Sequence, residues 1–230
     1  MKLLGIFLAV CVMALTASAQ TTFSNIEAMS GWHSCSACAG AGGDATYSMT
    51  QFISSPSLNG KSTKFNLGGT TPWSHALFYK TLSRNSTATH FIYDLYFYFK
   101  NPSASSGMEL AFNQRKGYKW YKWDLQCSYL SGIWRTYDDK NKTWVNTSIS
   151  CNRPKAYTWT HIILEGKRYN GKVYYVSVTT NGTKHYFNKS CYPQAMSSSS
   201  SQVGIRYEMN GNKYQTDYST WANKLKMTYW

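Results

Sequence analysis

Acidic residues are scarce in this sequence, which has 10 Asp and Glu against 24 Lys and Arg. A basic surface favours anionic partners such as acidic polysaccharide, and it also serves solubility alone. The lysines and arginines are spread along the chain rather than clustered. This distribution argues against a nucleic-acid-binding protein, because such proteins gather cations on one face or along one element.

Long apolar segments are missing everywhere except at the N-terminus. Lys2, the apolar run from Leu3 to Leu15 and the small residues Ala17-Ser18-Ala19 match a secretory signal peptide. The run is too short to anchor the chain in a bilayer, so no membrane span is predicted. We therefore predict a signal peptide over residues 1–19 and a mature chain over residues 20–230 that is extracellular or periplasmic. Loss of Lys2 lowers the formal net charge from +14 to +13.

Helical periodicity, linkers and internal repeats are also absent from the mature chain. Short alternating runs follow one another instead, and turn signals such as Asn170-Gly171 and Asn181-Gly182 separate them. This pattern predicts a single all-β domain, an antiparallel two-sheet jelly-roll sandwich, with a closed barrel as the structural alternative.

Five cysteines remain once Cys11 is lost with the signal peptide. Disulfides are the default in an exported protein. We expect Cys127 to pair with Cys151 across a β-excursion, and Cys35 to pair with Cys38 in a tight loop. Cys191 is then left over, either as a buried thiol or as a link to a second copy of the chain.

Motifs for metals, cofactors and nucleophilic catalysis are incomplete. The pattern His33-x-Cys35-x-x-Cys38 lacks the second ligand pair of a structural zinc site. The glycines at 40, 42 and 43 are not followed by the Lys-Ser/Thr of a phosphate loop, and no serine sits in a nucleophile turn. The sequence therefore predicts no metal and no cofactor.

Several segments carry a resemblance to a known superfamily. They are Gly31–Gly40, the strand-like run His90–Pro102, the Cys127/Cys151 pair, Tyr207–Asn210 and the terminal Leu225–Trp230. Over residues 23–230 the chain resembles the concanavalin A-like lectin and glucanase superfamily, and within it a group of uncharacterised secreted bacterial proteins. The resemblance implies a jelly-roll sandwich, and it leaves the activity open because the superfamily holds both lectins and hydrolases.

The run from His90 to Lys100 has two distinct faces, since side chains alternate along a strand. Phe91, Tyr93, Leu95, Phe97 and Phe99 form an apolar set that predicts a core-facing surface. The other set offers an imidazole, a carboxylate and two phenols, which suit the floor of a sugar-binding groove. Such tyrosines also serve simply to pack across strands and stabilise a sheet.

Glu109 and Glu208 are the two candidate catalytic residues. Each alternates with apolar neighbours, so each is predicted to face away from the core. A retaining glycosidase needs two carboxyls about 5 Å apart, and jelly-roll glucanases resemble this arrangement, with Glu109 as nucleophile and Glu208 as acid/base. The segment Leu110-Ala111-Phe112 lacks the further acidic or aromatic residues of those enzymes. Glutamates on outer strand faces are also often simply solvated or ion-paired.

The leading hypothesis is a secreted, lectin-like protein that binds a polysaccharide or other glycan, with an anionic glycan favoured by the basic charge, and that does not catalyse. The predicted groove consists of His90, Asp94, Tyr96, Tyr98, Glu109, Asn113, Trp120, Arg206, Glu208 and Asn210. The alternatives are a glycosidase, a polysaccharide lyase that would draw on Arg206 and a histidine such as His75 or His161, and a structural protein that assembles through exposed strands or Cys191.

Overall fold

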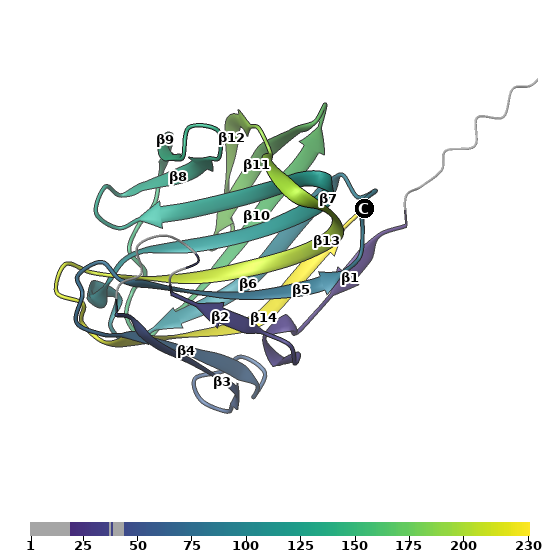
Figure 1. Cartoon of the computed structure of the whole chain (residues 1–230). Coiled ribbons are helices and arrows are strands. Elements are labelled where there is room, and N and C mark those ends of the chain that lie inside the picture. Colours follow the sequence, from purple (N-terminus) through teal and green to yellow (C-terminus); the bar gives the residue numbers. More distant parts are fainter. Residues whose placement is uncertain (1–18, 37, 39–43) are drawn as a thin grey trace, which may run out of the picture.

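The computed structural model describes residues 19–36, 38 and 44–230. The predicted signal peptide lies outside the described residues except for Ala19, as do the glycines at 40, 42 and 43. Within the described part, two antiparallel sheets pack face to face (Figure 1). The predicted sandwich is therefore confirmed, and the closed-barrel alternative is wrong.

The larger sheet has eight strands. Its order is β12 (Thr183–Cys191), β11 (Lys172–Thr180), β10 (Trp159–Tyr169), β6 (His90–Phe99), β14 (Tyr218–Tyr229), β4 (Ser62–Gly68) and β3 (Thr46–Ile53), with β1 (Thr21–Phe23) paired to β14. The smaller sheet has the order β2 (His33–Cys35), β5 (His75–Ser83), β13 (Gln194–Gly211), β7 (Ser105–Ser128), β8 (Ile133–Asp138) and β9 (Thr143–Ser150). Two short 3₁₀ turns, η1 (Ile26–Ala28) and η3 (Pro102–Ala104), are the described helical elements.

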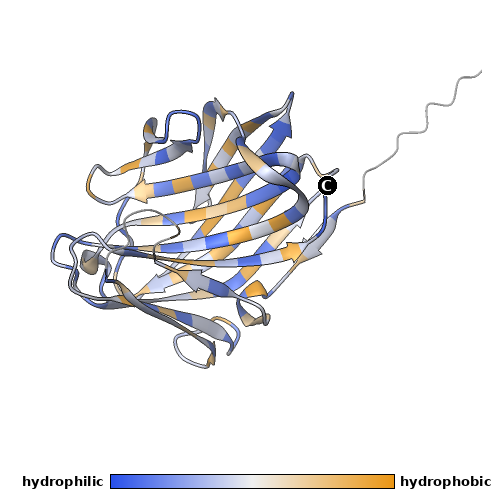
Figure 2. Cartoon of the chain, in the orientation of Figure 1, coloured by the Kyte–Doolittle hydropathy of each residue, from blue (hydrophilic) through white to orange (hydrophobic). Residues whose placement is uncertain are grey.

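The core lies between the sheets and follows the alternation of the strands. On β6 the apolar set, which runs from Phe91 to Phe99, is at most 4% exposed at every position. The bands of apolar and polar colour that alternate along the ribbons show the same period in most strands (Figure 2). The prediction that this set faces the core is confirmed.

The residues labelled β7 form a β-hairpin of two arms, which turns at Gly117. Gly117 has a φ of +59°, which glycine adopts at no steric cost. Beyond it the chain returns beside its own first half, so that the amide of Tyr129 donates to the carbonyl of Ser106 at 2.9 Å. Figure 1 shows the two arms side by side, with the start of β13 curling over their tip. The smaller sheet thus gains an extra arm between β13 and β8.

The predicted cysteine pairs are both present, Cys35 with Cys38 and Cys127 with Cys151. Cys191 is only 9% exposed, and burial raises the pKa of its thiol to about 12. This matches the buried-thiol alternative and gives no support to a disulfide between two copies of the chain. Among the described residues, no helix is long and apolar enough to cross a membrane.

Candidate functional site

The outer face of the smaller sheet carries the two candidate carboxylates side by side. Glu208 on β13 and Glu109 on β7 are direct cross-strand partners. Residues that oppose each other in this way have Cβ atoms about 4.5–5.5 Å apart. Both glutamates therefore lie in one sheet and on one face, as the glycosidase hypothesis requires.

Both carboxyl groups are held in an unusual state. Glu109 is 8% exposed and Glu208 is 5% exposed, and neither makes a hydrogen bond or an ion pair with any described residue. Burial raises the pKa of both, and the charge of Glu208 raises that of Glu109 further. Arg206 opposes both shifts, and Lys122 and Arg135 oppose that of Glu109. At least one carboxyl of the pair is thereby favoured in its neutral form near pH 7.

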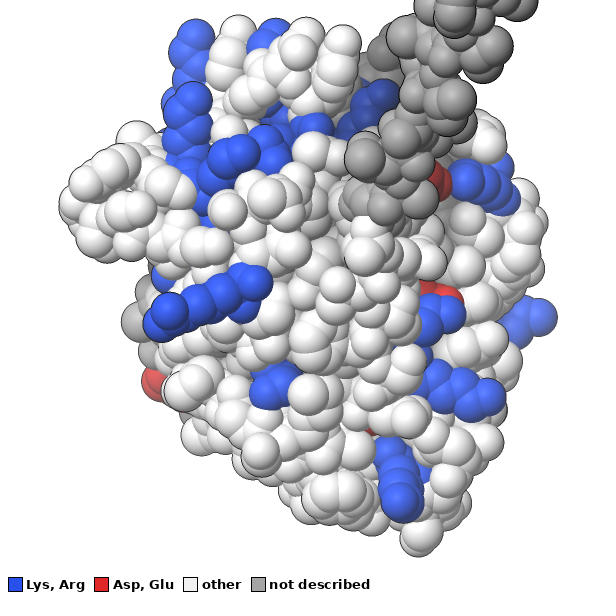
Figure 3. Space-filling model, turned by 90° about the vertical axis from the view of Figure 1, so that its right-hand side faces the viewer, with Lys and Arg blue, Asp and Glu red and all other residues white. Residues whose placement is uncertain are grey.

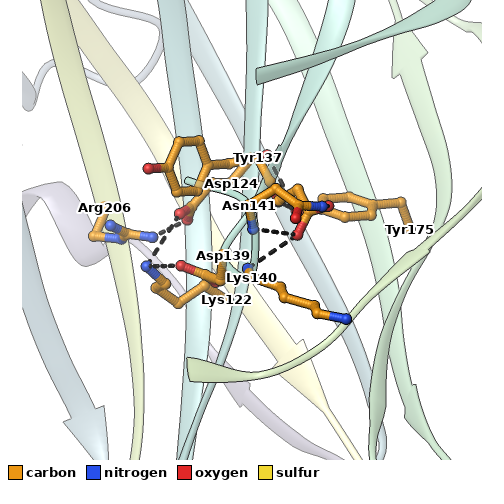
Figure 4. A network of polar contacts seen from close by, with 9 residues as sticks. Lys122, Asp124, Tyr137, Asp139, Lys140, Asn141, Tyr175 and Arg206 are labelled. Atoms are coloured by element: carbon orange, nitrogen blue, oxygen red, sulfur yellow. Dashed lines mark hydrogen bonds and ion pairs between the residues drawn. The ribbon is translucent and has the colours of Figure 1, made fainter. Parts of the chain in front are cut away.

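A network of ion pairs lies beside this pair (Figure 4). Arg206 crosses the small side chain of Ala111 to reach Asp124 on the returning arm of β7. Lys122 lies 2.5 Å from Asp139 and 3.9 Å from Asp124. The side chains of this network are at most 12% exposed, so each depends on its partners to remain charged. The network fixes the position of Arg206.

A pocket of about 460 Å³ opens on the same face, next to Arg206. Its walls combine aromatic, basic and amide side chains. They include His33, Tyr79, Lys80, Asn113, Arg115, Trp120, Gln202 and Arg206. Among the described residues that line it, none is Asp or Glu.

The aromatic walls of this pocket are held by other rings and by cations. The rings of His33 and Tyr79 stack with centroids 5.4 Å apart. Trp120 has Arg115 at 4.7 Å and Lys122 at 4.9 Å from its ring centroid. Its indole Nε1 is buried and donates no hydrogen bond within the described part of the chain. The pocket is therefore built from fixed side chains, one of which carries an unused donor.

The structure divides the groove that the sequence predicts. Asn113, Trp120 and Arg206 line the pocket, and Glu109 and Glu208 lie on the same face beside it. Asn210 lies on the same strand as Arg206, two residues beyond Glu208. It does not line the pocket.

The β6 residues of the predicted groove lie elsewhere, and placing them in one groove with β7 and β13 was wrong. His90, Asp94, Tyr96 and Tyr98 belong to the larger sheet and face its outer surface. The core between the sheets separates them from the pocket. Asp94 contacts His161 at 2.7 Å and Lys226 at 2.9 Å, so its charge is already paired.

Comparisons with known proteins find solved structures of similar fold, but no relatives by sequence. No protein-family model and no curated protein matches the sequence. Among solved structures, the cellulose-induced protein Cip1 gives a TM-score of 0.56 at 9% identity, over 89% of this chain and 96% of that one. An endo-β-1,4-glucuronan lyase from the fungus Trichoderma reesei gives 0.54 at 10% identity, over 89% and 94%. Arcelin-5, a lectin-like defense protein from Phaseolus vulgaris, gives 0.52 at 13% identity, over 93% and 99%.

The fold is that of the concanavalin A-like β-sandwiches. This confirms the superfamily resemblance as a statement about fold. Sequence reasoning did not place Tyr79 or Lys122 in the predicted groove, and it considered His33 only within the Cys35–Cys38 motif. The alternation of Lys122 with the core residues Tyr121 and Trp123 was a usable signal. The pairing of His33 with Tyr79 depends on contacts between β2 and β5, which no local pattern reveals.

Proposed function

We propose that this protein binds an acidic polysaccharide in the pocket on the outer face of its smaller sheet. The observation that carries the proposal is the lining of the pocket, where arginines, amides and aromatic rings meet and no described lining residue is acidic. Carboxylates pair well with the planar, two-pronged guanidinium of arginine. Arg206 is already paired with Asp124, so a neutral sugar would leave the charge of Arg115 uncompensated.

The individual side chains suit the parts of a uronic acid residue. Arg115 makes no ion pair with any described carboxylate, so its charge is available to a ligand. Asn113 and Gln202 can donate to and accept from hydroxyl groups. The rings of Tyr79 and Trp120 offer apolar faces for the C–H surface of a sugar, and their fixed positions limit the entropy lost on binding.

Export belongs to the same proposal. Two disulfides are typical of proteins that mature outside the cytosol, where polysaccharide is also met. Two proteins of similar fold carry names that refer to a glucuronan lyase and to a lectin-like protein. These names support the choice of β-1,4-linked glucuronate oligosaccharides as the first ligand to try.

The test is calorimetric titration of the Arg115→Gln variant with glucuronate oligosaccharides. Loss of one charged hydrogen bond costs about 1.5–3 kcal/mol, which corresponds to at least about tenfold weaker binding. Arg153→Gln is the matched control, because Arg153 is also an arginine packed on an aromatic ring, 5.7 Å from that of Tyr129, and lies outside the pocket. Equal binding by the wild type and both variants would refute the proposal that this pocket binds the polysaccharide.

A second candidate is hydrolysis of the bound polysaccharide by Glu109 and Glu208. The observation that favours it is the direct opposition of two buried carboxyls with raised pKa values, since hydrolysis with retention of configuration needs one neutral and one ionised carboxyl about 5 Å apart. Incubation with polysaccharide should then release reducing ends, and Glu109→Gln and Glu208→Gln should each abolish the release. A product with the ultraviolet absorbance of an unsaturated sugar would indicate elimination instead. Binding without either product would indicate a lectin-like protein that does not cleave the polysaccharide.

A further inference from the structure

A second cleft, of about 830 Å³, lies at the end of the smaller sheet where β7 turns back. Its cations are Arg84, from the loop that follows β5, and Lys116, next to Gly117 at the turn. Hydroxyl groups of Ser86 and of Ser199–Ser201 line the space between them, and Gln202 closes one side. No described residue of the lining is acidic.

The loop that carries Arg84 is held in place by hydrogen bonds from the half-buried Arg168 and the buried Gln114. Arg168 donates to the carbonyls of Ser86, Thr87 and Ala88 at 3.0–3.3 Å. Gln114, which is fully buried, donates to the carbonyl of Ala88 at 3.1 Å and accepts from Arg168 at 2.8 Å. The backbone at this rim is therefore fixed before any ligand arrives, while the Arg84 and Lys116 side chains are exposed.

Five carboxylates of the chain are engaged away from this cleft, and no described carboxylate lines it. Asp94, Asp124, Asp139 and Glu165 are ion-paired, and Glu27 accepts backbone amides. Figure 3 looks at the end of the sandwich where β7 turns, and it shows Lys and Arg gathered there with little acidic surface. A fixed, positive, hydroxyl-lined cleft suits an anion that also carries hydroxyl groups.

The cleft continues from the pocket of the proposed function. Gln202 lines both, Arg115 donates to Gln202, and Lys116 follows Arg115 in the chain. From Gly204 in the pocket to Ser200 in the cleft is four residues along β13, or about 13 Å at about 3.3 Å per residue. That span is longer than a single sugar residue, so one extended chain can occupy both places.

We propose that Arg84 and Lys116 form a second subsite for the same acidic polysaccharide, so that the protein selects extended chains over short ones. The inference rests on the proposed function. One end of the glycan lies between Tyr79 and Trp120, and the chain then follows β13 toward the turn at Gly117. There its carboxylates meet Arg84 and Lys116.

The test compares glucuronate oligosaccharides of increasing length, from disaccharide to octasaccharide, on the wild type and on the double variant Arg84→Ser/Lys116→Ser. Exposed ion pairs contribute up to about 1 kcal/mol each, so the long oligosaccharide should bind the double variant more weakly, by up to about 30-fold. The shortest oligosaccharide that binds should bind both proteins equally. The matched control is Arg153→Ser/Lys213→Ser, which removes one arginine and one lysine outside both sites.

The possible failures separate the two proposals. If short oligosaccharides bind and longer ones gain nothing, or if the double variant loses nothing, the subsite is refuted while the pocket stands. A second outcome is that long chains bind the wild type, that the double variant does not bind them, and that Arg115→Gln has no effect. This outcome would support the cleft and refute the pocket. If no acidic oligosaccharide of any length binds, both proposals are refuted.

Discussion

Replacing Glu208 by glutamine should change how the stability of the protein depends on pH. Burial raises the pKa of Glu208 from 4.5 to about 7, against the opposing charge of Arg206. Between these two values the folded state holds a proton that the unfolded state has released, so stability is lost as the pH rises through this window. A shift of about 2.5 pKa units corresponds to about 3 kcal/mol. Glutamine has the same shape and no charge, so it removes this loss.

The assay is urea unfolding of the wild type and of Glu208→Gln at about pH 5 and about pH 8. The wild type should lose stability relative to the variant between the two pH values, by up to about 3 kcal/mol. Glu165→Gln is the control with the opposite sign. Burial opposes ionisation of Glu165, but its bonds to Lys184 and Ser177 prevail and lower its pKa, so this variant should be the less stable protein at about pH 8. Parallel pH profiles for the wild type and Glu208→Gln would refute the buried, proton-holding state of the pair.

Three further changes test the scaffold that positions the site. Replacing Cys127 and Cys151 by alanine removes a disulfide that closes a loop of 24 residues. Under oxidising conditions the variant should have a free energy of unfolding about 3.5 kcal/mol lower than that of the wild type, and under reducing conditions the two proteins should be equally stable. Gly166→Ala should lower the Tm, because the ring of Trp123 occupies the space where a Cβ would go, and an unchanged Tm would contradict that packing. Asp124→Asn should cost about 3–5 kcal/mol, because it leaves the buried guanidinium of Arg206 without its carboxylate partner, and a cost below about 1 kcal/mol would mean that solvent reaches the network.

Local alternation predicted which way most side chains of the candidate site face. Glu109 and Glu208 alternate with core residues, and both do lie on the outer face of the smaller sheet. The same rule correctly assigned the apolar side of β6. These predictions succeed because the period of two is a property of the strand alone.

Sheet membership could not be predicted in this way. The polar side of β6 was grouped with β7 and β13, although β6 pairs with β10 and β14 in the other sheet. Those partners lie far away in the sequence, and no local pattern identifies them. The direct opposition of Glu109 and Glu208 is a register across 99 residues of sequence, and it too came only from the structure.

The most direct test of the proposed function is a comparison of two ligands that differ in one group. Oligosaccharides of β-1,4-linked glucuronate and of β-1,4-linked glucose, matched in length, differ only by the carboxylate at C6. Calorimetric titration at low and at high salt should show binding of the glucuronate chain that weakens with salt, and binding at least about tenfold weaker for the glucose chain. Equal affinity for both ligands, or preference for the neutral chain, would contradict an acidic-polysaccharide site.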